Sequence, residues 1–189
     1  MNLHRTTTVS LVALVLVFFA PPAIGFDFFE ITPGSSRSEV EDLLKEAGLR
    51  HRSPDPSRIE VRANVLAGVF ELQRAIFEFG MDGRLDTATV EITPAMNSDG
   101  VEVLELYDEV ASLLLRRLGR PTRERATGTI QDPGQILVGL STGELERMME
   151  WETESFVRIG IPRRVDGKIL VVVAVSSHAF PDNDPFWGQ

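Results

Sequence analysis

Apolar and polar positions alternate most clearly between residues 71 and 92. In residues 74–79 (RAIFEF) and 87–92 (TATVEI), one alternate set is wholly apolar and the other is mostly polar. A period of two places each set on one face of a pleated strand. Between the runs stands Gly80-Met81-Asp82-Gly83, and an Asp-Gly pair supplies the positive φ that tight hairpin turns need. The pattern predicts a β-hairpin, with a bulge after the turn because Leu85 is out of phase with the second run.

Further runs of strand-forming residues surround this hairpin. Residues 58–65 alternate in the same way, and a turn at Ala67-Gly68 would lead into the hairpin's first strand. Near the C-terminus we expect strands over residues 154–162 and 168–176, joined by a second Asp-Gly turn at residues 166–167. A brief strand is predicted over Ile136–Leu140.

Three helices are predicted from apolar spacing and end signals. Ser36 and Glu39 form a capping box, and apolar residues follow at helical spacing up to Gly48. Residues 101–118 carry a wide apolar stripe with two arginines in the last turn. A second capping box, Ser141 with Glu144, predicts a short helix to about Trp151. Residues 50–56 and 120–135 lack periodicity and are predicted to be loops.

These elements predict an α+β fold of two layers, with helices packed on one face of an antiparallel sheet. A polar linker over residues 94–100 suggests two tandem units, an α-β-β-β unit over residues 26–94 and a helix-plus-hairpin unit over residues 101–177. Whether the units arose by duplication stays open, because apolar helix stripes and Asp-Gly turns are common. Residues 178–189 are predicted to form a flexible tail.

Residues 1–25 have the three parts of a secretory signal peptide. A short basic start at Arg5 precedes the apolar run 9–20, and small residues at 23 and 25 predict cleavage after Gly25. The alternative is an uncleaved anchor, although the run is shorter than the ~20 residues of a membrane span. In either case we expect the rest of the chain to be exported, to the periplasm or outside the cell.

The charge and the cysteine count exclude several classes of function. The net charge is −9, and it becomes −10 once Arg5 leaves with the signal peptide. Nucleic acid and anionic membrane surfaces demand a basic patch, so we expect neither as a partner. The chain has no cysteine, which excludes disulfides and thiolate chemistry.

One motif suggests catalysis. Gly139-Leu140-Ser141-Thr142-Gly143 fits G-x-S-x-G, the nucleophile elbow of α/β-hydrolases, and Asp166 and His178 follow in the required order. We favour Ser141 as a helix N-cap, because an elbow needs a parallel sheet whereas the strands here come in hairpins. No metal site is predicted, because His51 and His178 are far apart in sequence. No cofactor is predicted either.

The last predicted strand is apolar on both faces. Three explanations are open: the strand is central and covered on both sides, the tail folds over its second face, or that second face binds a partner protein. Under the third explanation, the partner-binding residues are Ile76, Phe156, Leu170 and Val172.

Two short motifs carry a resemblance to known proteins. Residues 31–40 (ITPGSSRSEV) followed by Leu43-Leu44, and residues 77–85 (FEFGMDGRL), are similar to a module of bacterial envelope proteins in which a capped helix leads into a meander. The chain resembles the small lipoprotein of the outer-membrane β-barrel assembly machinery and the tandem-domain inhibitors of β-lactamase. The resemblance covers residues 31–93 and, more weakly, residues 101–177.

The resemblance implies helices on one sheet face, a free face that binds protein, and no enzyme activity. The chain departs from the lipoproteins because it has no cysteine to lipidate, and from the inhibitors because it has no disulfides and a single tyrosine, Tyr107. Neither family's partner nor its contact residues therefore carry over.

Together these observations predict a non-catalytic exported protein that binds another envelope protein through its sheet face. The alternatives are a serine hydrolase that uses Ser141 and a stand-alone structural protein.

Overall fold

A computed structural model describes residues 31–67, 70–94, 100–128, 133–162 and 169–181. The α-helices are α2 (Arg37–Glu46), α3 (Val101–Leu118) and α4 (Ile136–Thr142). A 3₁₀ turn, Pro133–Gln135, precedes α4. The strands are β1 (His51–Asp55), β2 (Arg58–Ala67), β3 (Phe70–Phe79), β4 (Leu85–Pro94), β5 (Arg123–Thr127), β6 (Glu146–Glu152), β7 (Phe156–Gly160) and β8 (Val171–Ser176).

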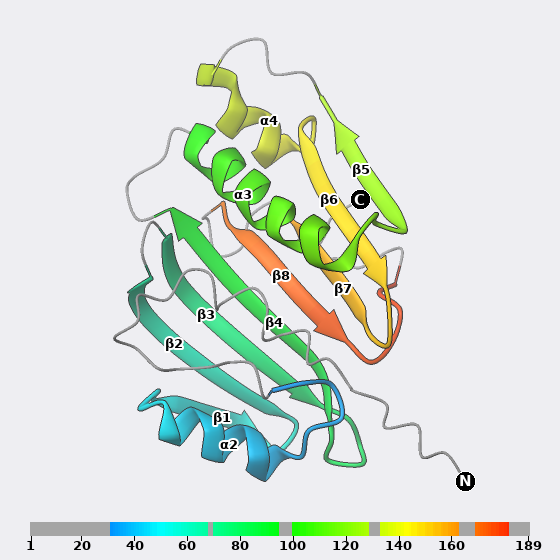
Figure 1. Cartoon of the computed structure of the whole chain (residues 1–189). Helices are drawn as coiled ribbons and strands as arrows, with labels where there is room; N and C mark the ends of the chain where they lie inside the picture. The colour runs from blue at the N-terminus through cyan, green and yellow to red at the C-terminus, as the bar shows by residue number, and fades with distance from the viewer. Residues whose placement is uncertain (1–30, 68–69, 95–99, 129–132, 163–168, 182–189) are drawn as a thin grey trace, which may run out of the picture.

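The strands form one eight-stranded sheet in the order β1-β2-β3-β4-β8-β7-β6-β5. All seven neighbouring pairs are antiparallel, which confirms the predicted antiparallel sheet and the α+β class. The last strand in the sequence therefore lies in the middle of the sheet, between β4 and β7, and the edges are β1 and β5 (Figure 1).

The hairpin formed by β3 and β4 confirms the predicted turn and bulge. The Gly80 N–H donates to the Arg84 carbonyl at 2.8 Å, and Gly83 has φ +73°, which favours glycine. Phe79 pairs with Leu85 whereas Glu78 pairs with Thr87, so Asp86 is the extra residue of a bulge. The bulge turns Leu85 into the core and leaves Asp86 toward the other face.

Two predicted helices are confirmed with their ends. In α2 the Ser36 hydroxyl accepts from the Glu39 N–H, and the Glu39 carboxylate accepts from the Ser36 N–H. The carboxylate accepts hydrogen bonds from Ser36, chiefly from its backbone N–H and also from its side chain, and these lower the pKa of Glu39 below its usual range. Helix α3 spans Val101–Leu118 as predicted and ends at Gly119, where φ is +77°.

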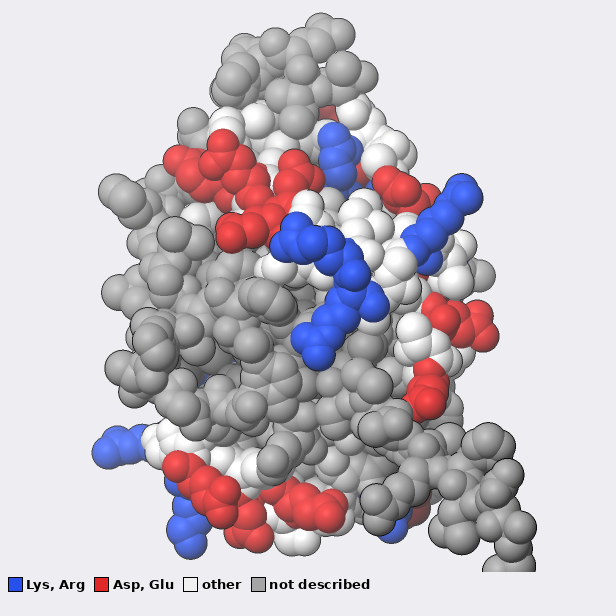
Figure 2. All heavy atoms as spheres, viewed as in Figure 1, with Lys and Arg blue, Asp and Glu red and all other residues white. Residues whose placement is uncertain are grey.

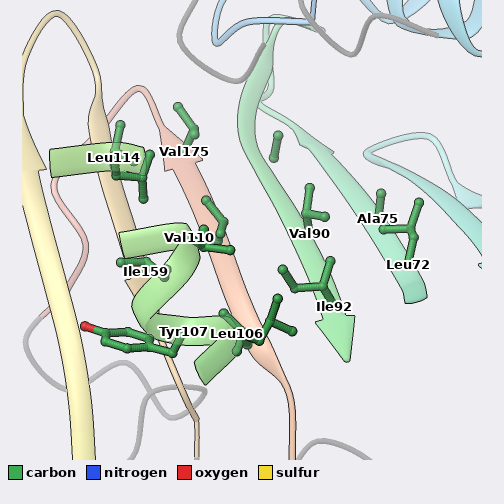
Figure 3. Packing of buried hydrophobic residues seen from close by; sticks show 14 of the residues in the cluster. Leu72, Ala75, Val90, Ile92, Leu106, Tyr107, Val110, Leu114, Ile159 and Val175 are labelled. Atoms are coloured by element: carbon green, nitrogen blue, oxygen red, sulfur yellow. The ribbon is translucent and has the colours of Figure 1, made fainter. Parts of the chain in front are cut away.

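The hydrophobic core lies between α3 and the middle of the sheet. Figure 3 shows apolar side chains of α3 that point at the strands, among them Leu106, Val110 and Leu114. The helix contacts β4, β7 and β8. Val40 and Leu44 of α2 belong to the same buried cluster. Burying a large apolar side chain contributes about 1.5–3 kcal/mol, so this cluster is the main source of stability.

Four local predictions were wrong. Residues 51–55 and 123–127, predicted as loops, are the edge strands β1 and β5. Their side chains are mostly exposed, so they carry no hydrophobic alternation, and their pairing with β2 and β6 decides their conformation. Pro54 fits in β1 because proline is tolerated in edge strands.

The segment from 136 to 152 is the reverse of what its pattern predicted. The apolar run at 136–140 belongs to α4 rather than a strand, and α4 ends at Gly143, where φ is +79°. The following residues form β6, in which Met149 and Trp151 face the core. A short apolar run fits a helix and a strand equally well. Here the pairing of residues 146–152 with β5 and β7 decides that this segment is a strand.

Several predictions lie wholly or partly outside the described residues: the signal peptide of residues 1–25, the turn at Ala67-Gly68, the linker over residues 94–100, the turn at Asp166-Gly167 and the last part of the tail, residues 182–189. Within the ranges that the structure describes, no helix has the length and apolar character needed to cross a membrane.

Candidate functional site

The sheet has one apolar face and one polar face. The register puts Ile59, Phe77, Ala88, Val175 and Val157 in one cross-strand row of the core face. The neighbouring positions form the polar face, in three rows. The rows are Arg58–Glu78–Thr87–Ser176–Phe156, Glu60–Ile76–Thr89–Ala174–Arg158–Glu150 and Arg62–Arg74–Glu91–Val172–Gly160.

Several charged side chains of the polar face are buried. Glu60, Glu91 and Arg158 are each at least nine-tenths buried. Each has an oppositely charged partner on a neighbouring strand, as buried charges require. Arg74 donates to both carboxylate oxygens of Glu91, at 2.9 and 2.6 Å, and Arg158 donates from Nε to Glu150 at 2.8 Å.

Two arginines share the buried Glu60 carboxylate. Arg52 donates from Nε to Oε2 at 2.8 Å, and Arg58 Nη2 lies 2.8 Å from Oε1. The hydrogen bond from Arg52 is the largest cause that lowers the pKa of Glu60, with further charge from Arg58, so this carboxylate stays ionised. The second negative neighbour of Arg58 is Glu78, whose side chain is 54% exposed and 4.0 Å away.

Arg58 also carries an unsatisfied buried atom. Its Nε is buried and has no hydrogen-bond partner among the described residues. Leaving a buried donor unsatisfied costs about 1–3 kcal/mol, and each such group in a folded protein requires an explanation.

A cavity of about 520 Å³ opens on this part of the polar face. This volume is within the range of small-molecule and peptide-side-chain pockets. Its lining comes from β2, β3, β4, β8 and the segment that follows β8. The lining residues are Arg58, Arg74, Ile76, Glu78, Asp86, Thr87, Thr89, Ala174, Ser176, His178, Ala179, Phe180 and Pro181.

The segment after β8 folds back along the polar face and forms one wall of the cavity. The Ser177 N–H donates to the Asp86 carbonyl at 2.9 Å, and the Ser177 hydroxyl donates to the Asp86 carboxylate. His178 Nε2 lies 3.3 Å from the same carboxylate. Farther along, the Phe180 ring covers the buried Arg158 guanidinium, with 4.4 Å between the guanidinium carbon and the ring centroid.

This polar cluster lacks the order of a catalytic triad. Asp86 stands between Ser177 and His178, so the imidazole contacts the carboxylate and not the hydroxyl. A nucleophilic serine needs the base at its hydroxyl, with the acid behind the base. The Ser176 hydroxyl accepts the His178 backbone N–H at 3.1 Å, which is a turn contact.

Ser141 is not placed as a nucleophile elbow requires. It lies in the last turn of α4, and its hydroxyl donates to the Val138 carbonyl at 2.8 Å. An elbow stands between a parallel strand and a following helix, but here the helix precedes Ser141 and the sheet is antiparallel. Ser141 is also not the predicted N-cap, because the chain continues into β6.

The predicted partner-binding residues do not form one exposed patch. Ile76, Phe156 and Val172 share the polar face, but Ile76 and Leu170 are buried and Val172 is fully buried. Ile76 lines the cavity, and Phe156 is half-buried. The apolar run of β8 therefore marks a central strand. The sequence did not predict the polar cavity lining around Ile76, because the lining residues come from several strands and the segment after β8.

Helix α3 lies on the other face of the molecule. Figure 2 shows separate acidic and basic clusters on the face that carries α3. The exposed acids of α3 are Glu105, Asp108 and Glu109. Arg116 and Arg117 lie in its last turn, where positive charge suits the helix dipole. Within the described part of the chain, no three acidic or histidine side chains are grouped as metal ligands.

Comparisons with protein-family models, curated proteins and solved structures gave no significant match to this chain. The function is therefore argued from the polar face alone.

Proposed function

We propose that this chain is a non-catalytic exported protein that binds another protein through the polar face of its sheet. The observation that carries the proposal is the open cavity over β2, β3, β4 and β8, lined by charged groups, hydroxyls and Ile76. Polar groups with a few apolar residues in a concave site are typical of recognition. The nearby serines and histidine are arranged for hydrogen bonding within the chain.

Two finer features of the fold belong to this proposal. We infer that α2 and α3 pack on the core face, so that the polar face stays accessible. We also infer that the chain consists of two tandem units, each with a helix before four antiparallel strands, the second unit having α4 inserted between β5 and β6. The strand order supports the second inference, because β1 to β4 and β5 to β8 run inward from opposite edges and meet at the β4–β8 pair.

Leu170 and Val172 are left out of the proposed contact surface because their side chains are buried. The resemblance to bacterial envelope proteins agrees with a protein partner, and it makes an envelope protein the first place to search. Export itself rests on residues 1–25, as predicted from the sequence.

A matched pair of variants tests which face binds. Thr89 lies on the cavity floor, where a Thr89→Arg side chain fills the cavity and still reaches solvent. Leu115→Arg adds the same residue to the exposed side of α3. The wild-type chain and both variants are used to retain proteins from an envelope extract, which are quantified by mass spectrometry.

We expect a protein that is retained by the wild type and by Leu115→Arg but lost with Thr89→Arg. Equal retention by all three chains would exclude the polar face as the binding surface. Ester hydrolysis by the wild-type chain that disappears in Ser141→Ala would replace the binding hypothesis with the hydrolase.

A further inference from the structure

The two ends of the cavity differ in chemistry. At the β2 end stands Arg58, with a buried unsatisfied Nε and with Glu60 already shared with Arg52. Two guanidinium groups on one buried carboxylate leave one positive charge, and the exposed carboxylates of Glu78, at 4.0 Å, and Asp55 compensate it weakly because water screens them. The buried Nε is closed to a ligand in the cavity, but the Arg58 side chain is 32% exposed and can donate to an anionic hydrogen-bond acceptor through its Nη atoms.

The far end of the cavity is apolar, whereas the rest of the lining carries hydroxyls and the Asp86 carboxylate, which is paired with His178. Phe180, Pro181 and Ala179 form the far wall, and Ile76 and Ala174 lie on the floor between the two ends. The hydroxyls of the floor are those of Thr87, Thr89 and Ser176. The Thr87 hydroxyl donates to the Ser176 hydroxyl at 3.3 Å, and Ser176 also accepts the His178 N–H. Peptide amides can use the remaining lone pairs of these hydroxyls and can bond the Thr89 hydroxyl, whereas an alkyl chain cannot.

The length of the cavity matches a few residues of extended chain. Arg58, Glu78, Thr87 and Ser176 lie in one row across four neighbouring strands. Three strand spacings are about 14 Å, which is the length of about four extended residues. Arg58 is the outermost lining residue on this side, since no described residue of β1 lines the cavity. A carboxylate that reaches Arg58 therefore belongs to the end of a ligand.

We propose that the cavity binds the last residues of a partner polypeptide, with the free C-terminal carboxylate at Arg58 and an apolar side chain against Phe180 and Ile76. This inference rests on the proposed function and specifies the part of the partner that is recognised. Charge-assisted hydrogen bonds from a guanidinium to a carboxylate are about twice as strong as neutral ones, so the carboxylate provides much of the affinity.

The test uses two pools of N-acetylated tetrapeptides with apolar side chains, one with free C-terminal carboxylates and one amidated. Binding to the full chain is followed by NMR, because the side-chain N–H of each arginine gives its own signal. We expect the acid pool, at about 1 mM, to shift the Arg58 Nε–H signal and the amide signals of Thr87 and Thr89. The amidated pool should leave them unchanged.

Three variants sharpen the result, and one of them is a control. Arg58→Gln should weaken binding of the acid pool at least about ten-fold, the loss of one charge-assisted bond, whereas Arg37→Gln on α2 should not change it. Glu78→Gln removes the competing carboxylate from an exposed position that the fold does not need, and it should tighten binding about two- to five-fold.

Equal shifts with both pools would exclude carboxylate recognition. It would also be excluded if the affinity for the acid pool were unchanged both in the Arg58→Gln chain and in the Glu78→Gln chain. No shift with either pool would also overturn this inference. If Thr89→Arg nevertheless abolishes retention of an envelope protein, the proposed function stands and only the recognised part of the partner is wrong.

Discussion

The two faces of this sheet are built from the same strands but are stabilised in different ways. On the core face, apolar side chains from six strands pack in one cluster with α3. On the polar face, buried arginines and glutamates pair across strands around an open cavity. Apolar burial contributes stability wherever volumes match, whereas a buried ion pair contributes little net stability and requires exact partners. The core face therefore holds the fold, and the polar face fixes where particular side chains stand.

The largest expected effect breaks a buried pair on the polar face. Arg74→Met leaves the buried Glu91 carboxylate without its bidentate partner, and we expect a loss of about 3–5 kcal/mol in the free energy of unfolding. The double variant Arg74→Met with Glu91→Leu should recover most of that loss, because two apolar side chains replace two charges. Urea denaturation measures both, and a double variant as unstable as the single one would contradict the comparison.

The next effect belongs to the core face. Leu114 is 1% exposed and Leu115, its neighbour on α3, is 37% exposed. Leu114→Ala should cost about 2–5 kcal/mol because it removes buried methyl groups and leaves a cavity. Leu115→Ala should change the free energy of unfolding by less than about 0.5 kcal/mol. Equal losses in urea denaturation would mean that α3 does not present this stripe to the sheet.

A smaller effect is expected at the N-terminus of α2, where the capping box is exposed. Ser36→Ala removes the acceptor of the Glu39 N–H and should cost about 1 kcal/mol. The pKa of Glu39 is lowered first by the Ser36 backbone N–H, which alanine keeps, and then by the Ser36 side chain. The same variant should therefore raise the pKa of Glu39 only part of the way toward its usual value, which NMR titration of the Glu39 carboxyl measures. An unchanged titration would show that the Ser36 hydroxyl does not contact this carboxylate in solution.

The smallest expected effect is a pH dependence of the polar face. Arginine neighbours lower the pKa of Glu60 in the folded state. A lowered pKa gives stability that is fully present above the unfolded value, about 4.3, and that is lost as the pH falls through the lower folded value. Glu60→Gln should therefore reduce the slope of stability against pH below about 4.3. Urea denaturation across that range measures it, and an unchanged slope would mean that Glu60 is not paired.

The sequence predicted best where local signals and packing agree. The β3–β4 hairpin, the bulge after its turn, the capping box at Ser36 and the whole of α3 followed from turn chemistry, caps and periodicity. Prediction failed at β1 and β5, whose exposed side chains have no pattern, and at 136–152, where a short apolar run fits helix and strand equally.

The candidate site was hardly predictable. Ile76 was the one residue of the cavity that the sequence singled out as a partner-binding residue, and it was singled out as part of an apolar patch. Arg58 and Phe180 are more than 100 residues apart in the chain, and no local spacing signals that they line one cavity.

By itself, the sequence determined the α+β class, the antiparallel pairing of its central hairpin and the apolar stripe of α3, because each depends on the order of neighbouring residues. Only the tertiary structure decided that the last strand is central, that the edges are β1 and β5, and that arginines and glutamates from separate strands meet on one face. The physical reason is that strand order and cross-strand contacts depend on hydrogen bonds and packing between distant segments, which no short stretch of sequence specifies.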